Sequence, residues 1–320
     1  MKWFYVRNHF NFRILEKIGQ DKTAKATDTT DNRKQREDGS AWNYSRSAGN
    51  CSVRTVRLAI ICLAVSWKRK KWSQVEQYQH VNGIILRSRD YKEADQLLTV
   101  YTREQGKITV QARGVKKTAS RLRSGILLFS HTSLVLTAGK AFPIVTGAST
   151  ETAFPLLRSD FTRMSYASYA AELLDQVIAD SQPDEDLFVL ILQTMYLLEN
   201  INPWLAVRHL ELRLLELQGY GIQLEHCLQC GAPLHGDRFY GVQGGVLCRI
   251  CSHGQQGGSA LTQEALAVLK AFSYIPMHRL GWVHISGEGR QSLEQYLELQ
   301  LQQVLSWRLK SRDFLKNMNL

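Results

Sequence analysis

The fold of this chain is decided by residues 81–112, which read VNGIILRSRDYKEADQLLTVYTREQGKITVQA. From residue 107 to 112 polar and apolar side chains alternate, the period-two pattern of a strand that is buried on one face. We predict three strands in this stretch, at residues 81–87, 96–102 and 107–112. Arg103-Glu-Gln-Gly106 separates the last two, and its glycine suits the positive φ that a tight hairpin turn requires.

Two more strand-like runs follow, at residues 130–137 and 142–149, and they are joined across Ala138-Gly139-Lys140. Five short antiparallel strands in so few residues are typical of a small closed barrel, and the OB-fold is the candidate that fits best. We therefore assign residues 79–152 to an N-terminal OB-fold β-barrel.

After residue 155 the apolar period changes to that of a helix. Asn202-Pro203 predicts a helix start, with Asn as the N-cap, and Gly219 predicts the end of that helix. Further helices are predicted at residues 262–274 and 292–309. We interpret Asp184-Glu185-Asp186 as a capping cluster at a helix N-terminus, not as a metal site. Residues 153–224 and 259–320 thus form one α-helical domain, and the fold class is α+β.

Four cysteines form the most specific motif of the sequence. Cys227 and Cys230 make one Cys-x2-Cys pair, and Cys248 and Cys251 make a second pair after seventeen residues. This spacing predicts one structural zinc ion held by four thiolates, with glycines at the turns, in a ribbon at residues 225–258 inserted into the helical domain. Four protein ligands leave no open position for substrate, so hydrolytic zinc chemistry is not expected.

Alternatives for this site stay open at the level of sequence. Three histidines lie nearby, and one of them could replace a cysteine as ligand: His226, His235 and His253. The other alternative is four buried thiols without a metal. Cys51 and Cys62 lie outside the motif, and we assign them no role.

Positive charge is confined to the first half of the chain. Residues 1–78 carry 16 Lys and Arg against 7 Asp and Glu, and residues 79–150 carry 11 against 4. Residues 151–320 carry 13 against 18, so this part is acidic although the whole chain is at +11. A surface for nucleic acid should therefore lie before residue 150.

Within the barrel the cations concentrate on the connection after the third strand. Five of them fall in eleven residues: Arg113, Lys116, Lys117, Arg121 and Arg123. No acidic residue interrupts this run, so we predict that the loop binds phosphate; the alternative is a solvated charged loop without a ligand. Four more cations could extend the surface: Arg87, Arg89, Lys92 and Lys107. Tyr91 or Tyr101 could stack on bases.

Residues 1–78 differ in character from the rest of the chain. The segment 21–50 has almost no large apolar residue, so we expect a disordered N-terminal extension, either a basic tail or the product of a wrongly assigned start. The apolar run at residues 58–65 is too short for a bilayer, which needs roughly 20 residues, so no membrane association is expected. The cysteine pairs suit a reducing cytoplasm. We find no motif typical of an enzyme.

Several of these segments together resemble the RecO family of bacterial recombination mediators. The resemblance rests on residues 81–95, on Thr102-Arg-Glu-Gln-Gly-Lys107 with Ala112-Arg-Gly114, on Gly244-Gly245 before Cys248, and on Ser311-Arg-Asp-Phe-Leu315. It covers about residues 79–316. It implies an OB domain, a helical domain with an inserted zinc ribbon, and no catalytic residues.

The resemblance also implies a function and partners. A member of this family binds single- and double-stranded DNA, anneals complementary strands, and helps RecA displace single-strand-binding protein, usually together with RecR. Such a protein would be cytoplasmic and associated with the nucleoid, and it would contact the tail of single-strand-binding protein through its helical domain. The alternative is a zinc-ribbon transcription or translation factor with an OB-fold and no annealing activity.

Overall fold

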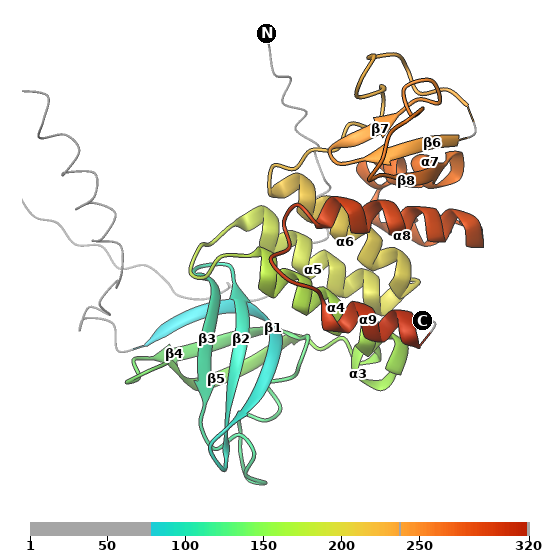
Figure 1. Ribbon diagram of the computed structural model, residues 1–320. Helices are drawn as coiled ribbons and strands as arrows, with labels where there is room; N and C mark the ends of the chain where they lie inside the picture. The colour runs from blue at the N-terminus through green and yellow to red at the C-terminus, as the bar shows by residue number, and fades with distance from the viewer. Residues whose placement is uncertain (1–77, 237, 319–320) are drawn as a thin grey trace, which may run out of the picture. The chain divides into compact units, whose positions relative to one another are not determined.

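The computed structural model describes residues 78–236 and 238–318, all of which belong to one compact unit, residues 69–320 (Figure 1). The predictions for the N-terminal extension, including the apolar run at 58–65, lie outside the described residues. Within them, no helix is both long and apolar enough to span a membrane. The predicted fold class is confirmed: a closed five-stranded barrel precedes an α-helical region that contains a cluster of four cysteines.

The barrel consists of strands β1 (Gln79–Tyr91), β2 (Asp95–Thr102), β3 (Gly106–Ala112), β4 (His131–Thr137) and β5 (Ile144–Thr152). They close in the order β1-β2-β3-β5-β4. The prediction of purely antiparallel pairing is wrong at one point, because β3 and β5 pair in parallel through Gln111 and Ile144. β3 and β5 have the same direction because the chain passes through one further strand, β4, between them, and β4 is antiparallel to β5.

Two cores meet at the first two strands of the barrel. Ile85, Leu98 and Val100 point into the barrel, whereas Ile84, Leu86 and Tyr101 belong to the core of the helical region. Successive residues of a strand face opposite sides, so β1 and β2 are covered on both sides. This arrangement joins the barrel and the helices through a shared apolar layer.

The predicted hairpin turn between β2 and β3 is confirmed, and Gly106 has φ +69°. A Cβ atom at this position would lie only 2.2 Å from the carbonyl oxygen of Gln182, in the connection before α5. Glycine is therefore required here twice, for the backbone conformation and for the close approach of a neighbouring segment.

The first half of the helical region contains α3 (Leu156–Ser159), α4 (Phe161–Val177), α5 (Glu185–Asn200) and α6 (Pro203–Leu217). Side chains cap the three longer helices. Asp160 accepts from the Arg163 N–H at the start of α4, and the two caps predicted from the sequence follow: Asp184 accepts from the Leu187 N–H, and Asn202 accepts from the Trp204 N–H. Glu185 and Asp186 follow in the first turn of α5, which confirms the capping cluster. Gly219, with φ +83°, ends the turn after α6.

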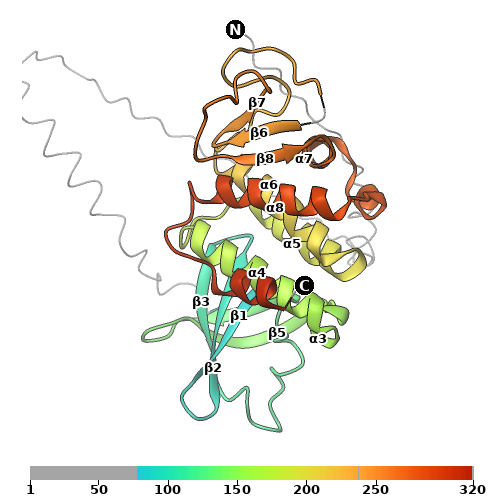
Figure 2. The same cartoon turned by 45° about the vertical axis from the view of Figure 1, so that its right-hand side comes forward.

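The second half contains α7 (Gln263–Tyr274), the 3-10 helix η1 (Met277–Trp282), α8 (Gly287–Leu301) and α9 (Lys310–Asn317). The prediction of one helix at residues 292–309 is wrong. Ser286 is the N-cap of α8, and the helix begins at Gly287, five residues before the predicted start. It ends at Leu301, before the predicted end. The chain then turns so that α9 can pack on α4, where the Glu172 carboxylate accepts hydrogen bonds from the Lys310 and Ser311 N–H groups (Figure 2).

A three-stranded sheet with the order β7-β6-β8 carries the cysteine motif, and its strands are β6 (Arg238–Val242), β7 (Gly245–Leu247) and β8 (Ser259–Thr262). The β6–β7 hairpin is the one expected between the cysteine pairs, whereas β8 was not predicted. The Ser292 hydroxyl of α8 accepts from the Thr262 N–H and donates to the Ala260 carbonyl, so a helix side chain satisfies the free edge of β8.

Candidate nucleic-acid interface and metal centre

The connection from β3 to β4 holds the predicted basic loop, residues 113–123, against the barrel. The Asp95 carboxylate accepts a hydrogen bond from the Gly114 N–H at 2.8 Å, and this bond holds the pKa of Asp95 below its usual range. The Lys116 N–H donates to the Ala94 carbonyl, and the Val115 side chain is buried in the barrel core. The loop backbone is thus attached to the barrel while its charged side chains point outward.

All five predicted cations of this basic loop are exposed: Arg113, Lys116, Lys117, Arg121 and Arg123. Lys116 has an acidic partner, because its ammonium lies 2.9 Å from the Asp90 carboxylate and lowers the pKa of that group. The other four form no ion pair among residues 78–236 and 238–318. The loop therefore carries four exposed cations that form no ion pair within these ranges, and one of them, Arg113, adds to the effect of the Gly114 N–H in lowering the pKa of Asp95.

The four cations predicted to extend this surface lie in different settings, and Lys92 is exposed beside Tyr91. Arg89 is exposed on β1. Arg87 is also exposed, and its guanidinium lies 3.5 Å from the Asp175 carboxylate of α4. Lys107 is buried, and its ammonium lies 3.2 Å from both the Asp175 and the Asp180 carboxylates. Lys107 therefore belongs to the seam between barrel and helices, and we leave it out of the interface proposed below.

The two predicted stacking tyrosines differ in the same way. Tyr91 is half-buried at the end of β1, with Phe142 edge-on at 6.3 Å between ring centroids and the Lys92 ammonium 5.5 Å from its ring. Tyr101 is fully buried, and its hydroxyl donates to the Asp184 carbonyl, so the prediction that it could stack on bases is wrong. Tyr101 faces out of the barrel, but the helical core covers that face.

The four predicted metal ligands come together in the ribbon. The sulfur atoms of Cys227, Cys230, Cys248 and Cys251 all lie within 4.8 Å of one another. Cys230 and Cys248 have sulfurs 3.9 Å apart. In a tetrahedral thiolate site with metal–sulfur bonds of about 2.3 Å, neighbouring sulfurs lie about 3.8 Å apart. The cluster thus has the size that a four-coordinate metal ion needs.

Backbone geometry explains how the sulfurs converge. Gly231 (φ +71°) follows the first pair and Gly244 (φ +79°) precedes the second, as the sequence predicted for the turns. The Cys227 sulfur accepts a hydrogen bond from the Cys248 N–H at 3.4 Å. Burial opposes ionisation of this thiol, but N–H groups of Cys230 and Cys248 outweigh burial and lower the pKa of Cys227 to about 6. Burial and hydrogen bonds with the other three thiols raise the pKa of Cys251 to about 12. A bound metal ion would therefore be needed to hold all four groups as thiolates.

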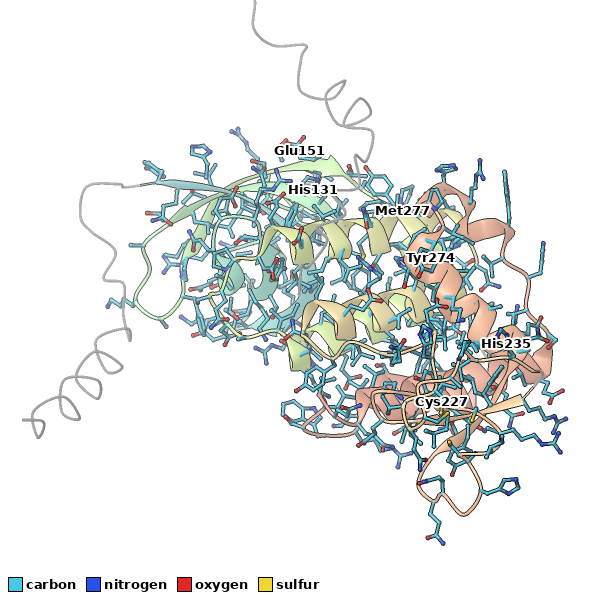
Figure 3. All side chains as sticks on the ribbon, turned by 90° about the horizontal axis from the view of Figure 1, so that it is seen from above. His131, Glu151, Cys227, His235, Tyr274 and Met277 are labelled. Carbon is cyan, nitrogen blue, oxygen red and sulfur yellow. The ribbon has the colours of Figure 1, made fainter. Side chains whose placement is uncertain are left out.

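The cluster contains no histidine. His226, His235 and His253, the alternative ligands, are all exposed, and Figure 3 shows His235 and Cys227 at separate points of the ribbon. This is the one group of three or more His, Cys, Asp and Glu side chains in the described part of the chain with metal-binding geometry. The residues present therefore fit a metal site of four thiolates.

A second site was missed by sequence reasoning. A cavity of about 1030 Å³ lies among α4, α6, α8 and α9, and residues from the first turns of α4, α6 and α8 line it. Arg208 and Glu211 of α6 form a buried ion pair at 3.0 Å beside it, and the Tyr169 hydroxyl donates to Glu211. Burial raises the pKa of Glu211 and raises that of Tyr169 well above its usual value.

This network is not fully satisfied. The Nε atoms of Arg208 and Arg312 and one carboxylate oxygen of Glu211 are buried without a hydrogen-bond partner in the described residues. Helix N-termini and unpaired guanidinium N–H groups both favour anions. The sequence signal for this site was two opposite charges three residues apart within the otherwise apolar stripe of α6.

Comparison with known proteins finds two family models that together match most of the described residues. A family model described as "Recombination protein O N terminal" matches residues 77–154, and one described as "Recombination protein O C terminal" matches residues 158–313. The protein named DNA repair protein RecO from Symbiobacterium thermophilum is 32% identical over 245 residues, which cover 75% of this chain and 97% of that protein. Its namesake from Pelotomaculum thermopropionicum is 33% identical over 235 residues, 73% of this chain and 92% of that protein.

A third relative, DNA repair protein RecO from Desulfitobacterium hafniense, is 38% identical over 182 residues, 56% of this chain and 66% of that protein. The matched regions include the barrel with its basic loop and the helical region with the cysteine ribbon. The chain belongs to the RecO family of DNA repair proteins.

Proposed function

We propose that this protein is a recombination mediator that binds single- and double-stranded DNA on its barrel and anneals complementary strands. It acts as a binding protein without turnover, in the cytoplasm and in association with the nucleoid. The observation that carries the proposal is the set of four exposed loop cations that form no ion pair in the described residues: Arg113, Lys117, Arg121 and Arg123. The alternative of a transcription or translation factor is not favoured, since both family models describe recombination proteins.

Repulsion between phosphates opposes the pairing of two strands, and the basic loop supplies the charge that offsets it. The loop side chains contact phosphates and leave the base edges free to pair. Tyr91 lies next to Asp90, the partner of Lys116, so an aromatic pair with Phe142 stands beside the cationic loop. Base stacking on Tyr91 would favour single strands, because their bases are accessible.

We propose that the four cysteines hold zinc, because thiolates in a closed tetrahedral set select this ion in most structural sites. The ion would cross-link residues 225–258 and stabilise their fold. It would take no part in catalysis, since cysteine sulfurs would fill all four of its coordination positions. The acidic balance of residues 151–320 supports a structural role for the ribbon, with DNA bound elsewhere.

RecR, RecA and single-strand-binding protein are the proposed partners. We propose that the tail of single-strand-binding protein enters the helical cavity. Four arginines line the cavity, namely Arg163, Arg208, Arg290 and Arg312, and their positive charge would attract a peptide that ends in a carboxylate. Arg290 lines the same cavity and is exposed. Arg290→Glu should therefore weaken binding of a labelled tail peptide, and an unchanged Kd would remove the cavity from the proposal.

Strand annealing on DNA coated with single-strand-binding protein tests the main proposal. Replacing Lys116, Lys117, Arg121 and Arg123 with Glu should abolish annealing without changing the fold, which thermal unfolding checks. Arg238→Glu is a control for charge reversal outside the barrel, because the Arg238 side chain is 81% exposed and lies on β6. Undiminished annealing by the loop variant would refute the assignment of DNA binding to the loop.

A further inference from the structure

We propose that Asp175 competes with DNA phosphate for Arg87 and so limits how much of the barrel surface holds DNA. The inference rests on the proposed function and concerns the regulation of the same interface. Its basis is the charged seam between barrel and helices, where carboxylates of the helical region lie on cations of the barrel.

Asp175 lies in the last turn of α4 and faces two barrel cations. Its carboxylate lies 3.2 Å from the Lys107 ammonium and 3.5 Å from the Arg87 guanidinium. Lys107 also donates to the Asp175 carbonyl at 2.8 Å and pairs with Asp180 at 3.2 Å. Lys107 is thus held by three oxygens from the helical region.

Arg87 is held much less firmly than Lys107. The side chain of Lys107 is 10% exposed, whereas that of Arg87 is 58% exposed. In the described residues Asp175 is the ion-pair partner of Arg87, and Arg87 also lies near Glu172, one turn earlier on α4. Burial opposes ionisation of Glu172, but hydrogen bonds from Ser311 and Lys310 and, to a smaller extent, Arg87 lower its pKa. An exposed pair at 3.5 Å is weak and is screened by salt. A DNA phosphate can therefore take the place of Asp175 on Arg87 but not on Lys107.

Arg87 is also within reach of a strand that lies on the basic loop. It faces the opposite side of β1 from Asp90, the partner of Lys116, because three residues separate the two and successive residues of a strand alternate. Arg89 lies between them and is exposed. A DNA backbone that crosses from the loop to the outer face of β1 would meet the exposed Arg89 first and then Arg87, which pairs with Asp175.

The competition has a use in strand annealing. A protein that gathers two strands must release the duplex once it has formed, and each additional fixed phosphate contact slows release. Because Arg87 pairs with Asp175, it does not hold DNA at all times. It binds a phosphate only when the DNA backbone is close enough to displace the Asp175 carboxylate. The loop would thus capture DNA, and the seam would limit how firmly the DNA is retained.

The test is the affinity for single-stranded DNA of the full chain and of Asp175→Asn, measured as a function of salt. One more phosphate contact should raise affinity roughly fivefold at 0.1 M salt and steepen the slope of log K against log salt by about 0.7. A gain of affinity cannot arise from loss of structure. Arg87→Ala alone should change affinity less than twofold, and it should abolish the gain in the double variant with Asp175→Asn.

Asp180→Asn is the matched control, because it removes the same charge from a side chain that pairs with Lys107 and not with Arg87. An equal gain in Asp175→Asn and Asp180→Asn, or a gain that persists with Arg87→Ala, would overturn the competition. If Asp175→Asn leaves the affinity unchanged while the parent protein binds DNA, the inference alone fails. If the parent protein shows no salt-dependent binding, the proposed function fails and this inference with it.

Discussion

Replacing Arg121 and Arg123 with Gln should halve the salt dependence of binding to single-stranded DNA. Each neutralised phosphate contributes roughly −0.7 to the slope of log K against log salt. The four loop cations without acidic partners predict about −2.8, and a fifth contact would bring the slope to about −3.5 if Lys116 leaves Asp90. Removing two contacts should lower the four-contact slope to about −1.4 and the affinity at 0.1 M salt roughly 25-fold.

Fluorescence polarisation of a labelled oligonucleotide between 50 and about 300 mM salt measures both quantities. The matched control carries Gln at Arg238 and Arg308, which are 81% and 76% exposed but lie outside the barrel. The control has the same net charge as the loop variant, so a purely global charge effect would change both equally. Equal slopes in the two variants would refute the assignment of phosphate contacts to the loop.

Three further predictions concern stability. Cys248→Ser should lose stoichiometric zinc and unfold the ribbon locally, since structural zinc contributes on the order of 10 kcal/mol; metal analysis with hydrogen exchange would show it, and one retained zinc per chain would contradict it. Burial, with a smaller effect of Arg213, lowers the pKa of His209 to about 4. In the unfolded chain the pKa of this histidine is about 6.5, so the unfolded state binds the proton more readily. The free energy of unfolding is therefore unaffected above about pH 6.5 and is lower by about 2 kcal/mol at pH 5. Urea unfolding should show that fall, and His209→Leu should abolish it; an unchanged pH profile would be incompatible with this explanation. Gly219→Ala should lower the free energy of unfolding by about 1 kcal/mol, because φ is positive but no atom lies within 4 Å of the new Cβ. Gly106→Ala should lower it by at least about twice as much, because its Cβ would also clash with Gln182. Similar losses of unfolding free energy in the two glycine variants would show that the clash is relieved.

The features that were predictable from sequence depend on short-range signals. The alternation at residues 107–112 and Gly106 define the β2–β3 hairpin locally, and Asn202-Pro203 defines the start of α6. The cysteine spacing similarly determines which sulfurs can converge on one ion. In each case the residues that carry the pattern are also the ones that make the contacts.

The features that the sequence did not show concern contacts between segments far apart in the chain. In the sequence Lys107 is one cation among others. Its ion-pair partners Asp175 and Asp180 lie about 70 residues further along the chain and hold it between the barrel and the helices. Tyr101 lies on a strand whose outer face is covered by helices, which no pattern within the strand reveals. The end of α8 was misplaced for the same reason, because α9 is positioned by Glu172, 138 residues before Lys310.

The cavity could not be predicted because its walls come from four helices. Arg208 and Glu211 indicated a buried charge pair on α6, but the volume beside them depends on how α4, α8 and α9 pack. Sequence periodicity identifies the buried face of each helix and does not show where packing between faces is incomplete.

The parallel pairing of β3 with β5 has a consequence for the kinetics of folding. The β1–β2, β2–β3 and β4–β5 pairings join neighbours in sequence, whereas Gln111 with Ile144 and the β1–β4 ladder must wait until residues 113–130 bring their ends together. Because non-local pairings set the rate for such topologies, the basic loop is also the segment whose closure we expect to limit refolding. Lengthening it with glycine and serine should slow refolding and leave the unfolding rate almost unchanged, since the loop is closed in both the transition state and the native state. A rise in the unfolding rate alone would show that the barrel closes later, after the transition state.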